Sequence, residues 1–95
     1  MAKKAIVLLT PFSSKQLKKL PLHIREAFYF WVHLIENFGL VRTRKIPGYR
    51  DKILSGARKG QRSVRLNRGY RIFYTEADSA EEIELTVIGV NKHEY

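Results

Sequence analysis

Two arginines, a histidine and a tyrosine are the residues of this 95-residue sequence that can combine into one reactive site. If Asn67-Arg68-Gly69 is a hairpin loop, Arg65 stands directly opposite Arg71 on the paired strands. Like charges that face each other destabilise a strand pair, so both side chains are solvated or an anion lies between them. A register slip of one residue would separate them. We favour the anion because further cations are close in the sequence: Arg58, Lys59, Arg62 and Arg68.

The last residues of the sequence offer a proton donor and an aromatic ring. His93 can exchange a proton near neutral pH, and Tyr95 can stack on a base or hold a proton. RNA cleavage by attack of a 2′-hydroxyl on the adjacent phosphorus needs cations for the developing charge and an acid for the leaving 5′-oxygen. Arg65, Arg71 and His93 can meet both needs without a metal. The alternative is a solvated C-terminal end that does no chemistry.

The distribution of charge indicates an anionic partner. The sequence contains 18 basic and 9 acidic side chains, a net charge of +9. Residues 41–75 carry eleven of the basic side chains, against which Asp51 stands alone. Because guanidinium groups match the geometry of phosphate, nucleic acid is the leading partner class. The alternative is a basic surface without a specific partner.

Composition and motifs exclude other classes of protein. Without cysteine, the chain forms no disulfide, thiolate zinc site or cysteine nucleophile. The apolar run at residues 5–9 is shorter than a membrane span or a signal peptide, so we expect a cytoplasmic protein with no membrane segment. His23 and His33 lie ten residues apart, do not form a metal pair, and are expected at the surface. Gly56–Gly60 is only a weak phosphate-loop pattern, and we expect neither metal nor cofactor.

The elements that must position these groups follow from the apolar pattern. Residues 5–10 form a short run with β-branched members that predicts a strand. Ser13 and Gln16 have the spacing of a capping box, which predicts a first helix that ends at Leu20-Pro21. A second helix runs up to Gly39, with one apolar stripe expected in the core: Ile24, Ala27, Phe28, Trp31, Leu34, Ile35 and Phe38.

The second half of the sequence predicts a basic connection followed by three strands. Residues 40–60 form the connection, and strands follow at 61–66, 70–75 and 83–90. Beside the arginine pair, the pairs expected across the hairpin are Ser63–Phe73, Val64–Ile72 and Leu66–Tyr70. The order β-α-α-β-β-β predicts one α+β domain over residues 1–95, with two N-terminal helices packed on one face of a mainly antiparallel sheet.

Four segments resemble the RelE/HigB-like toxins of bacterial toxin–antitoxin pairs: Leu54-Ser55-Gly56, Lys59–Leu66, Gly69–Tyr74 and Val90–Tyr95. The order of elements is also similar to that of the RelE/ParE superfamily. The resemblance implies a RelE-like domain that acts as a ribosome-dependent mRNA endonuclease, an mRNA interferase that cuts the codon in the decoding site and inhibits translation. It also implies a cognate antitoxin as partner, together with the ribosome and its messenger, and a free toxin that is monomeric.

The resemblance also implies roles for individual residues. Arg65 and Arg71 match the cations that bind the phosphate and stabilise the transition state. His93 matches the general acid, and Tyr95 the terminal aromatic residue that orients the substrate. The general base has no clear owner; Asp51, Lys59 and the α-carboxylate of Tyr95 are candidates. The residues expected to contact ribosomal or messenger RNA are Arg58, Lys59, Arg62, Ser63, Arg68 and Lys92.

Two alternatives and one surface remain open. A ParE-like inhibitor of DNA gyrase shares the fold, and a non-catalytic RNA-binding module would carry the same charge. The His93–Tyr95 ending favours the nuclease, because a protein that only binds needs no proton donor there. Tyr29 and Phe30 lie off the apolar stripe and predict either a surface for an acidic antitoxin segment or further core contacts. The alternative surface for such a segment is the basic face of the sheet.

Overall fold

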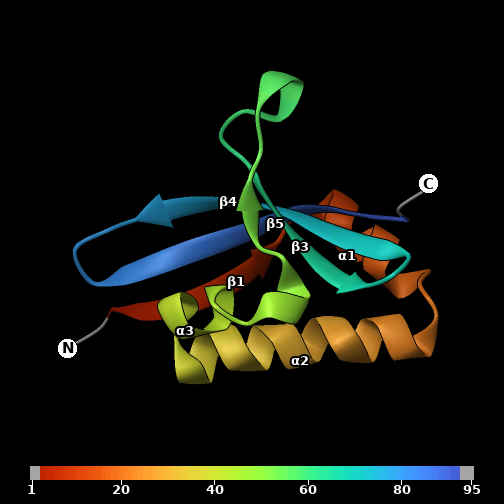
Figure 1. Cartoon of the computed structure of the whole chain (residues 1–95), viewed down its shortest axis with the longest axis horizontal. Coiled ribbons are helices and arrows are strands. Elements are labelled where there is room, and N and C mark those ends of the chain that lie inside the picture. The colour runs from red at the N-terminus through yellow and green to blue at the C-terminus, as the bar shows by residue number, and fades with distance from the viewer. Residues whose placement is uncertain (1–2, 93–95) are drawn as a thin grey trace.

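The computed structural model describes residues 3–92, and within this range five strands form one sheet in the order β1-β5-β4-β3-β2 (Figure 1). The strands are β1 (Lys4–Leu9), β2 (Lys52–Ile53), β3 (Arg62–Asn67), β4 (Tyr70–Asp78) and β5 (Glu82–Lys92). β1 runs parallel to β5, and the other neighbouring pairs are antiparallel. The helical elements of this range are α1 (Pro11–Lys18), α2 (Leu22–Phe38), α3 (Leu40–Arg44), η1 (Pro47–Tyr49) and η2 (Gly56–Arg58). The predicted α+β class is confirmed, but the connection at 40–60 also contains α3 and β2.

Helix α2 supplies the core on one face of the sheet (Figure 1). Its apolar residues recur every three or four positions, and those that are buried are Ile24, Phe28, Trp31, Leu34 and Ile35. The sequence pattern places Phe38 in the same stripe, but this side chain is 60% exposed. The helix ends at Gly39, whose φ of +93° suits glycine, and Leu40 of α3 takes a buried position instead.

Helix α1 hydrogen-bonds to the edge of β5 at the end of its pairing with β1. β1 pairs with β5 only as far as Val87. Beyond that point Ser13 Oγ donates to the Val87 carbonyl at 2.6 Å, and Gln16 Oε1 accepts from the Val90 amide at 2.9 Å. The predicted capping box is therefore wrong. Thr10 is the N-cap, with its Oγ1 accepting from the Ser13 amide, while Ser13 and Gln16 satisfy the backbone of the sheet.

The β3–β4 hairpin has the predicted register except at its end. Arg65 lies opposite Arg71, and the pairs Ser63–Phe73 and Val64–Ile72 also form as predicted. The predicted Leu66–Tyr70 pair is wrong, because a bulge between Arg65 and Asn67 sets Asn67 opposite Tyr70. Asn67 Oδ1 accepts from the amides of Gly69 and Tyr70, so the asparagine side chain shapes the turn.

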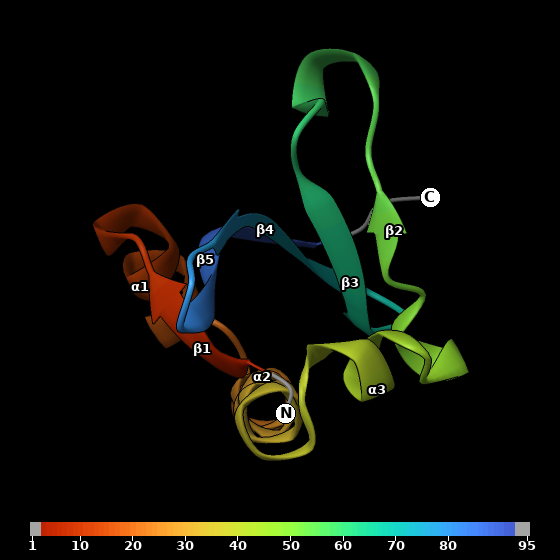
Figure 2. The same ribbon diagram turned by 90° about the vertical axis from the view of Figure 1, so that its left-hand side faces the viewer.

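Residues 52–61, here called the arm, rise from the sheet on the side away from α2 (Figures 1 and 2). β2 pairs with β3 through Lys52–Ser63 and Ile53–Arg62, and the Leu54 amide continues the ladder to the Gln61 carbonyl at 3.0 Å. Gly56 and Gly60 have φ values of +66° and +92°, which few other residues adopt. The two glycines thus let the arm double back over the sheet.

Candidate functional site

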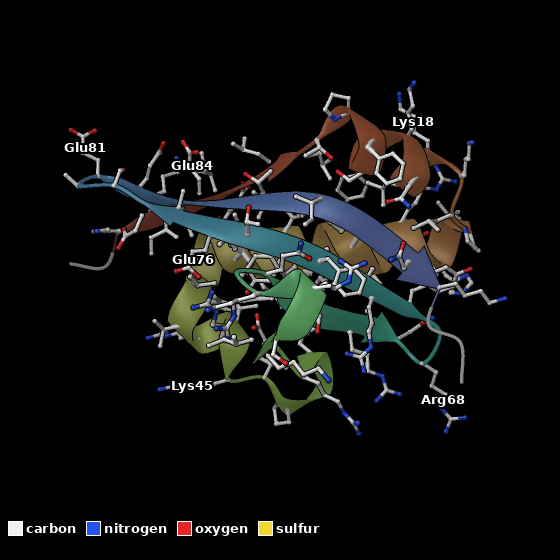
Figure 3. All side chains as sticks on the ribbon, turned by 90° about the horizontal axis from the view of Figure 1, so that it is seen from above. Lys18, Lys45, Arg68, Glu76, Glu81 and Glu84 are labelled. Atoms are coloured by element: carbon white, nitrogen blue, oxygen red, sulfur yellow. The ribbon has the colours of Figure 1, made fainter. Side chains whose placement is uncertain are left out.

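The alternation of side chains along β3 and β4 sorts the arginines onto two faces of the sheet. Val64 and Ile72 are fully buried on the face that α2 covers. Arg65 and Arg71 alternate with them and therefore lie on the opposite face, here called the open face. Asn91 of β5 lies opposite Arg71, so a polar row crosses three strands. Figure 3 looks onto this face, with η2 in front of the sheet and α2 behind it.

Arg65 and Arg71 keep most of their hydrogen-bonding capacity for another group. Arg65 Nε donates to the Asn67 carbonyl at 3.3 Å, and Arg71 Nη1 donates to Ser63 Oγ at 3.4 Å. Within residues 3–92 neither guanidinium forms an ion pair. Each guanidinium carries five N–H donors, and most of them remain available beside these long contacts to neutral groups. The two arginines can therefore bind one anion from two neighbouring strands.

A third cation reaches the open face from the arm. The Arg58 guanidinium carbon lies 3.9 Å from the centre of the Phe73 ring. Its Nη1 donates to Gln61 Oε1 at 2.9 Å, which fixes the side chain from within the arm. Phe73 lies between Ser63 and Gly89, both of them buried and small. The sequence reasoning missed Phe73 as a site residue, although its alternation with Ile72 places it beside Arg71.

The other predicted RNA contacts divide into exposed and internal residues. Lys59, Arg68 and Lys92 are exposed on the arm, the hairpin loop and the end of β5. Ser63 is fully buried, and its hydroxyl accepts from Arg71 rather than facing solvent. Arg62 lies on the face opposite Arg65, where its Nε donates to Asp51 Oδ1 at 2.7 Å. Arg62 is thus separated from the cations of the open face.

Asp51 is the centre of a buried network on the helix-covered side. Its side chain is only 2% exposed and accepts from Arg62 and from the Tyr74 hydroxyl, the latter at 2.6 Å. Arg44 of α3 approaches the same carboxylate at 3.8 Å, donates to Tyr74 and pairs with Glu76. The network joins α3, β3 and β4 to the segment that leads into the arm. This placement removes Asp51 from the candidates for the general base.

Burial and hydrogen bonding shift the pKa values of two groups in this network, Tyr74 and Arg44. Burial raises the pKa of Tyr74 to about 12, and the hydrogen bond that Tyr74 donates to Asp51 adds to the rise. Burial lowers the pKa of Arg44, but its hydrogen bonds to Glu76 and Tyr74 outweigh that effect and the net shift is upward. Both groups therefore keep their protons well above neutral pH, which suits a structural role.

Charge is also separated along the sheet. Figure 3 shows Glu81 and Glu84 at the end of the sheet formed by the β4–β5 turn, and Arg68 at the end formed by the β3–β4 hairpin. The cations of the open face lie toward the Arg68 end. A polyanion is therefore attracted to one end of the face and repelled from the other.

The remaining predicted residues lie either outside the described range or on α2. His93 and Tyr95 lie outside the described residues, so their roles as acid and stacking residue stay predictions. His23 and His33 are exposed on α2, as predicted. Among residues 3–92 no cluster of three histidine, aspartate or glutamate side chains is arranged to hold a metal ion. No helix in this part of the chain is long and apolar enough to cross a membrane.

Comparison with known proteins adds the fold relationship. No protein-family model and no curated protein matches the sequence. A YoeB/ParE toxin from Agrobacterium tumefaciens superposes with a TM-score of 0.68 at 18% identity, over 94% of this chain and 99% of that one. The RelBE2 toxin–antitoxin complex from Mycobacterium tuberculosis gives 0.65 at 23% identity, over 93% and 96%. An archaeal RelE–RelB complex from Pyrococcus horikoshii gives 0.66 at 18% identity, over 97% and 96%. The chain has the RelE-like fold.

Proposed function

Starting from the RelE-like fold, we propose that this protein is the toxin of a toxin–antitoxin pair and that it cleaves messenger RNA on the ribosome. The observation that carries the proposal is the facing pair Arg65 and Arg71, which has no carboxylate partner among residues 3–92. Like charges that face each other destabilise a strand pair, and an anion bound between the two arginines offsets this repulsion. Solved structures of the same fold include toxins of toxin–antitoxin pairs, several of them in complex with antitoxins.

The proposed reaction uses the 2′-hydroxyl of the substrate as nucleophile. A bond forms between this oxygen and the adjacent phosphorus while the bond to the 5′-oxygen breaks, which leaves a cyclic phosphate. Arg65 and Arg71 hold the phosphate and stabilise the charge that develops on its oxygens. His93 gives a proton to the leaving 5′-oxygen, and Tyr95 orients the substrate. No step requires a metal. Lys59 and the α-carboxylate of Tyr95 remain the candidates for the base that takes the proton of the attacking 2′-hydroxyl.

Exposed cations near this pair provide the proposed contacts to ribosomal and messenger RNA. They are exposed on the arm, on the hairpin loop and at the end of β5: Arg58, Lys59, Arg68 and Lys92. Arg62 was part of the predicted set, but its ion pair with the buried Asp51 assigns it to the framework instead. We place the activity in the cytoplasm, where ribosomes and messenger are found.

A cognate antitoxin is the proposed inhibitor of the free, monomeric toxin. Solved structures with this fold include several toxin–antitoxin complexes. Tyr29 and Phe30 are 57% and 59% exposed on α2, and such rings are suited to contact an amphipathic segment. Because the toxin carries a net charge of +9, we expect the antitoxin segment to be acidic.

The test is induction of the parent protein and of a His93→Gln variant in bacterial cells, with mapping of messenger 5′ ends. Glutamine keeps a hydrogen-bond donor but cannot deliver a proton at neutral pH. We expect translation-dependent breaks within codons for the parent and a loss of breaks for the variant, while both proteins bind ribosomes. Breaks in chromosomal DNA without cleavage of messenger would instead identify a ParE-like inhibitor of gyrase, and binding without either kind of break would identify a passive RNA-binding module.

A further inference from the structure

The stack of Arg58 on Phe73 is a feature of the open face that the cleavage chemistry does not use. Arg58 is exposed, yet its guanidinium carbon lies only 3.9 Å from the centre of the ring. A guanidinium that rests on an aromatic ring presents one planar surface to the ring and the other to solvent. Gln61 holds the group in place through its Oε1. The outer surface of this cation is therefore flat, fixed and accessible.

The position of Phe73 requires an explanation of its own. The core residues of β4 are Ile72 and Tyr74, which are fully buried on the face of the sheet that α2 covers. Phe73 lies on the open face, where its neighbours across the strands are Ser63 and Gly89. Because both neighbours are small, the face of the Phe73 ring is open and Arg58 can lie on it. The core does not need an aromatic residue at this position.

The stack lies one row away from the arginine pair. Phe73 and Arg71 are two residues apart on β4, so their side chains emerge on the same face roughly 7 Å from each other along the strand. This spacing is of the order that separates the phosphate of a nucleotide from a neighbouring base. An RNA strand whose phosphate lies between Arg65 and Arg71 can therefore place one of its bases next to Arg58.

We propose that Arg58, supported by Phe73, is a stacking platform for a nucleobase of single-stranded RNA beside the phosphate site. Guanidinium planes and aromatic rings both stack on bases in proteins that bind single-stranded RNA. That the ligand is messenger RNA rests on the proposed function. It adds a base contact to a site whose other cations contact only phosphate.

The proposal is tested with the full-length protein and short 2′-O-methyl oligoribonucleotides, which cannot be cleaved through the 2′-position. One strand carries all its bases, and its matched control is abasic at every position. Arg58→Lys keeps the charge and removes the plane, and Arg68→Lys makes the same chemical change at an exposed arginine of the hairpin loop. Binding is measured by fluorescence anisotropy, and thermal unfolding checks that each variant is folded.

We expect Arg58→Lys to weaken binding of the complete strand by roughly tenfold, within the range of one stacked base, and to leave the abasic strand within about twofold. Arg68→Lys should affect the two strands equally. Phe73→Leu, which keeps an apolar side chain without a ring, should reproduce the loss seen with Arg58→Lys. An equal loss on both strands, or no loss on either, would overturn the platform, because Arg58 would then contact phosphate or serve only the arm.

The outcome is separate from that of the proposed function. If the parent cleaves messenger on ribosomes and Arg58→Lys does not distinguish the two strands, the platform fails and the nuclease stands. If the parent cleaves nothing and Arg58→Lys does distinguish them, the nuclease fails and a base-reading RNA-binding surface remains.

Discussion

Arg62 and Arg65 are three residues apart on β3, but they face opposite sides of the sheet and have different surroundings. Arg62 lies on the helix-covered side, where its Nε is 2.7 Å from a carboxylate oxygen of the buried Asp51. Arg65 lies on the open face, opposite Arg71. Within residues 3–92 its side chain donates a hydrogen bond to the backbone carbonyl of Asn67. One arginine is neutralised by the protein, and the other is held against a like charge.

This difference separates a structural cation from a binding cation. Partly buried charges require partners, and Asp51 supplies them for Arg62 and, more distantly, for Arg44. The cations of the open face are kept close together without such a partner, which raises the free energy of the folded protein unless an anion is present. Residues that act in binding are expected to show this pattern, because a carboxylate beside them would compete with the phosphate.

The largest effect is expected at the open face. Replacing Arg71 with alanine removes one preorganised donor of positive charge, which typically lowers the rate of such reactions by ~10²–10³. The free energy of unfolding should stay the same or rise, since the repulsion from Arg65 is relieved. Cleavage of messenger on purified ribosomes and denaturant unfolding measure the two quantities. A variant that loses stability together with activity would make Arg71 a structural residue like Arg62.

A second effect is expected on the helix-covered side, and it concerns stability. Asp51→Asn leaves the charge of Arg62 without its partner and should lower the free energy of unfolding by about 2–3 kcal/mol, less than for a fully buried pair because Arg62 keeps some contact with water. The matched control is Asp78→Asn, which breaks the exposed pair of Asp78 with Lys3 and should change stability by less than about 1 kcal/mol. Equal effects of the two substitutions would show that the network around Asp51 does not hold the framework.

The sequence predicts the open face better than the network beneath it. The facing of Arg65 and Arg71 follows from alternation and a short loop, both of which are local properties of the hairpin. The bulge that separates Leu66 from Tyr70 depends on hydrogen bonds of the Asn67 side chain, which alternation does not encode. Local pattern therefore suffices for the register of the site but not for the end of the hairpin.

The contacts that pattern reasoning missed join segments that the chain brings together only after folding. Asp51 meets Arg62 because β2 pairs with β3, and β2 is a strand of two residues whose sequence carries no periodic signal. Arg58 reaches Phe73 only because the arm doubles back at Gly56 and Gly60. Tertiary contacts rather than local propensity form these short elements, so their residues look like a loop in the sequence.

A third effect concerns how the free energy of unfolding depends on pH, which Tyr74 on the helix-covered side should influence. The pKa of Tyr74 is raised to about 12, above its ordinary value of about 10, so the folded state holds this proton more tightly than the unfolded state. The stabilisation is complete below pH 10 and is lost as the pH rises toward 12, by up to about 2–3 kcal/mol. Tyr74→Phe should flatten this part of the profile of unfolding free energy against pH. Parallel profiles of parent and variant would contradict the assignment, and the comparison cancels the titration of lysines and of Tyr49, which the variant retains.

The smallest effect concerns the salt dependence of RNA binding. Each phosphate that the protein neutralises contributes about −0.7 to the slope of log affinity against log salt for a single strand. Arg65→Gln should therefore make the slope shallower by about 0.7, and it should not lower the free energy of unfolding, since Arg65 forms no ion pair within residues 3–92. Arg62→Gln is the matched control on the same strand: its charge is already neutralised by Asp51, so the slope should stay unchanged while stability falls. Titrations at four or five salt concentrations resolve the two slopes. An equal change of slope for both variants would mean that RNA does not distinguish the two faces, and the separation of structural from binding arginines would be lost.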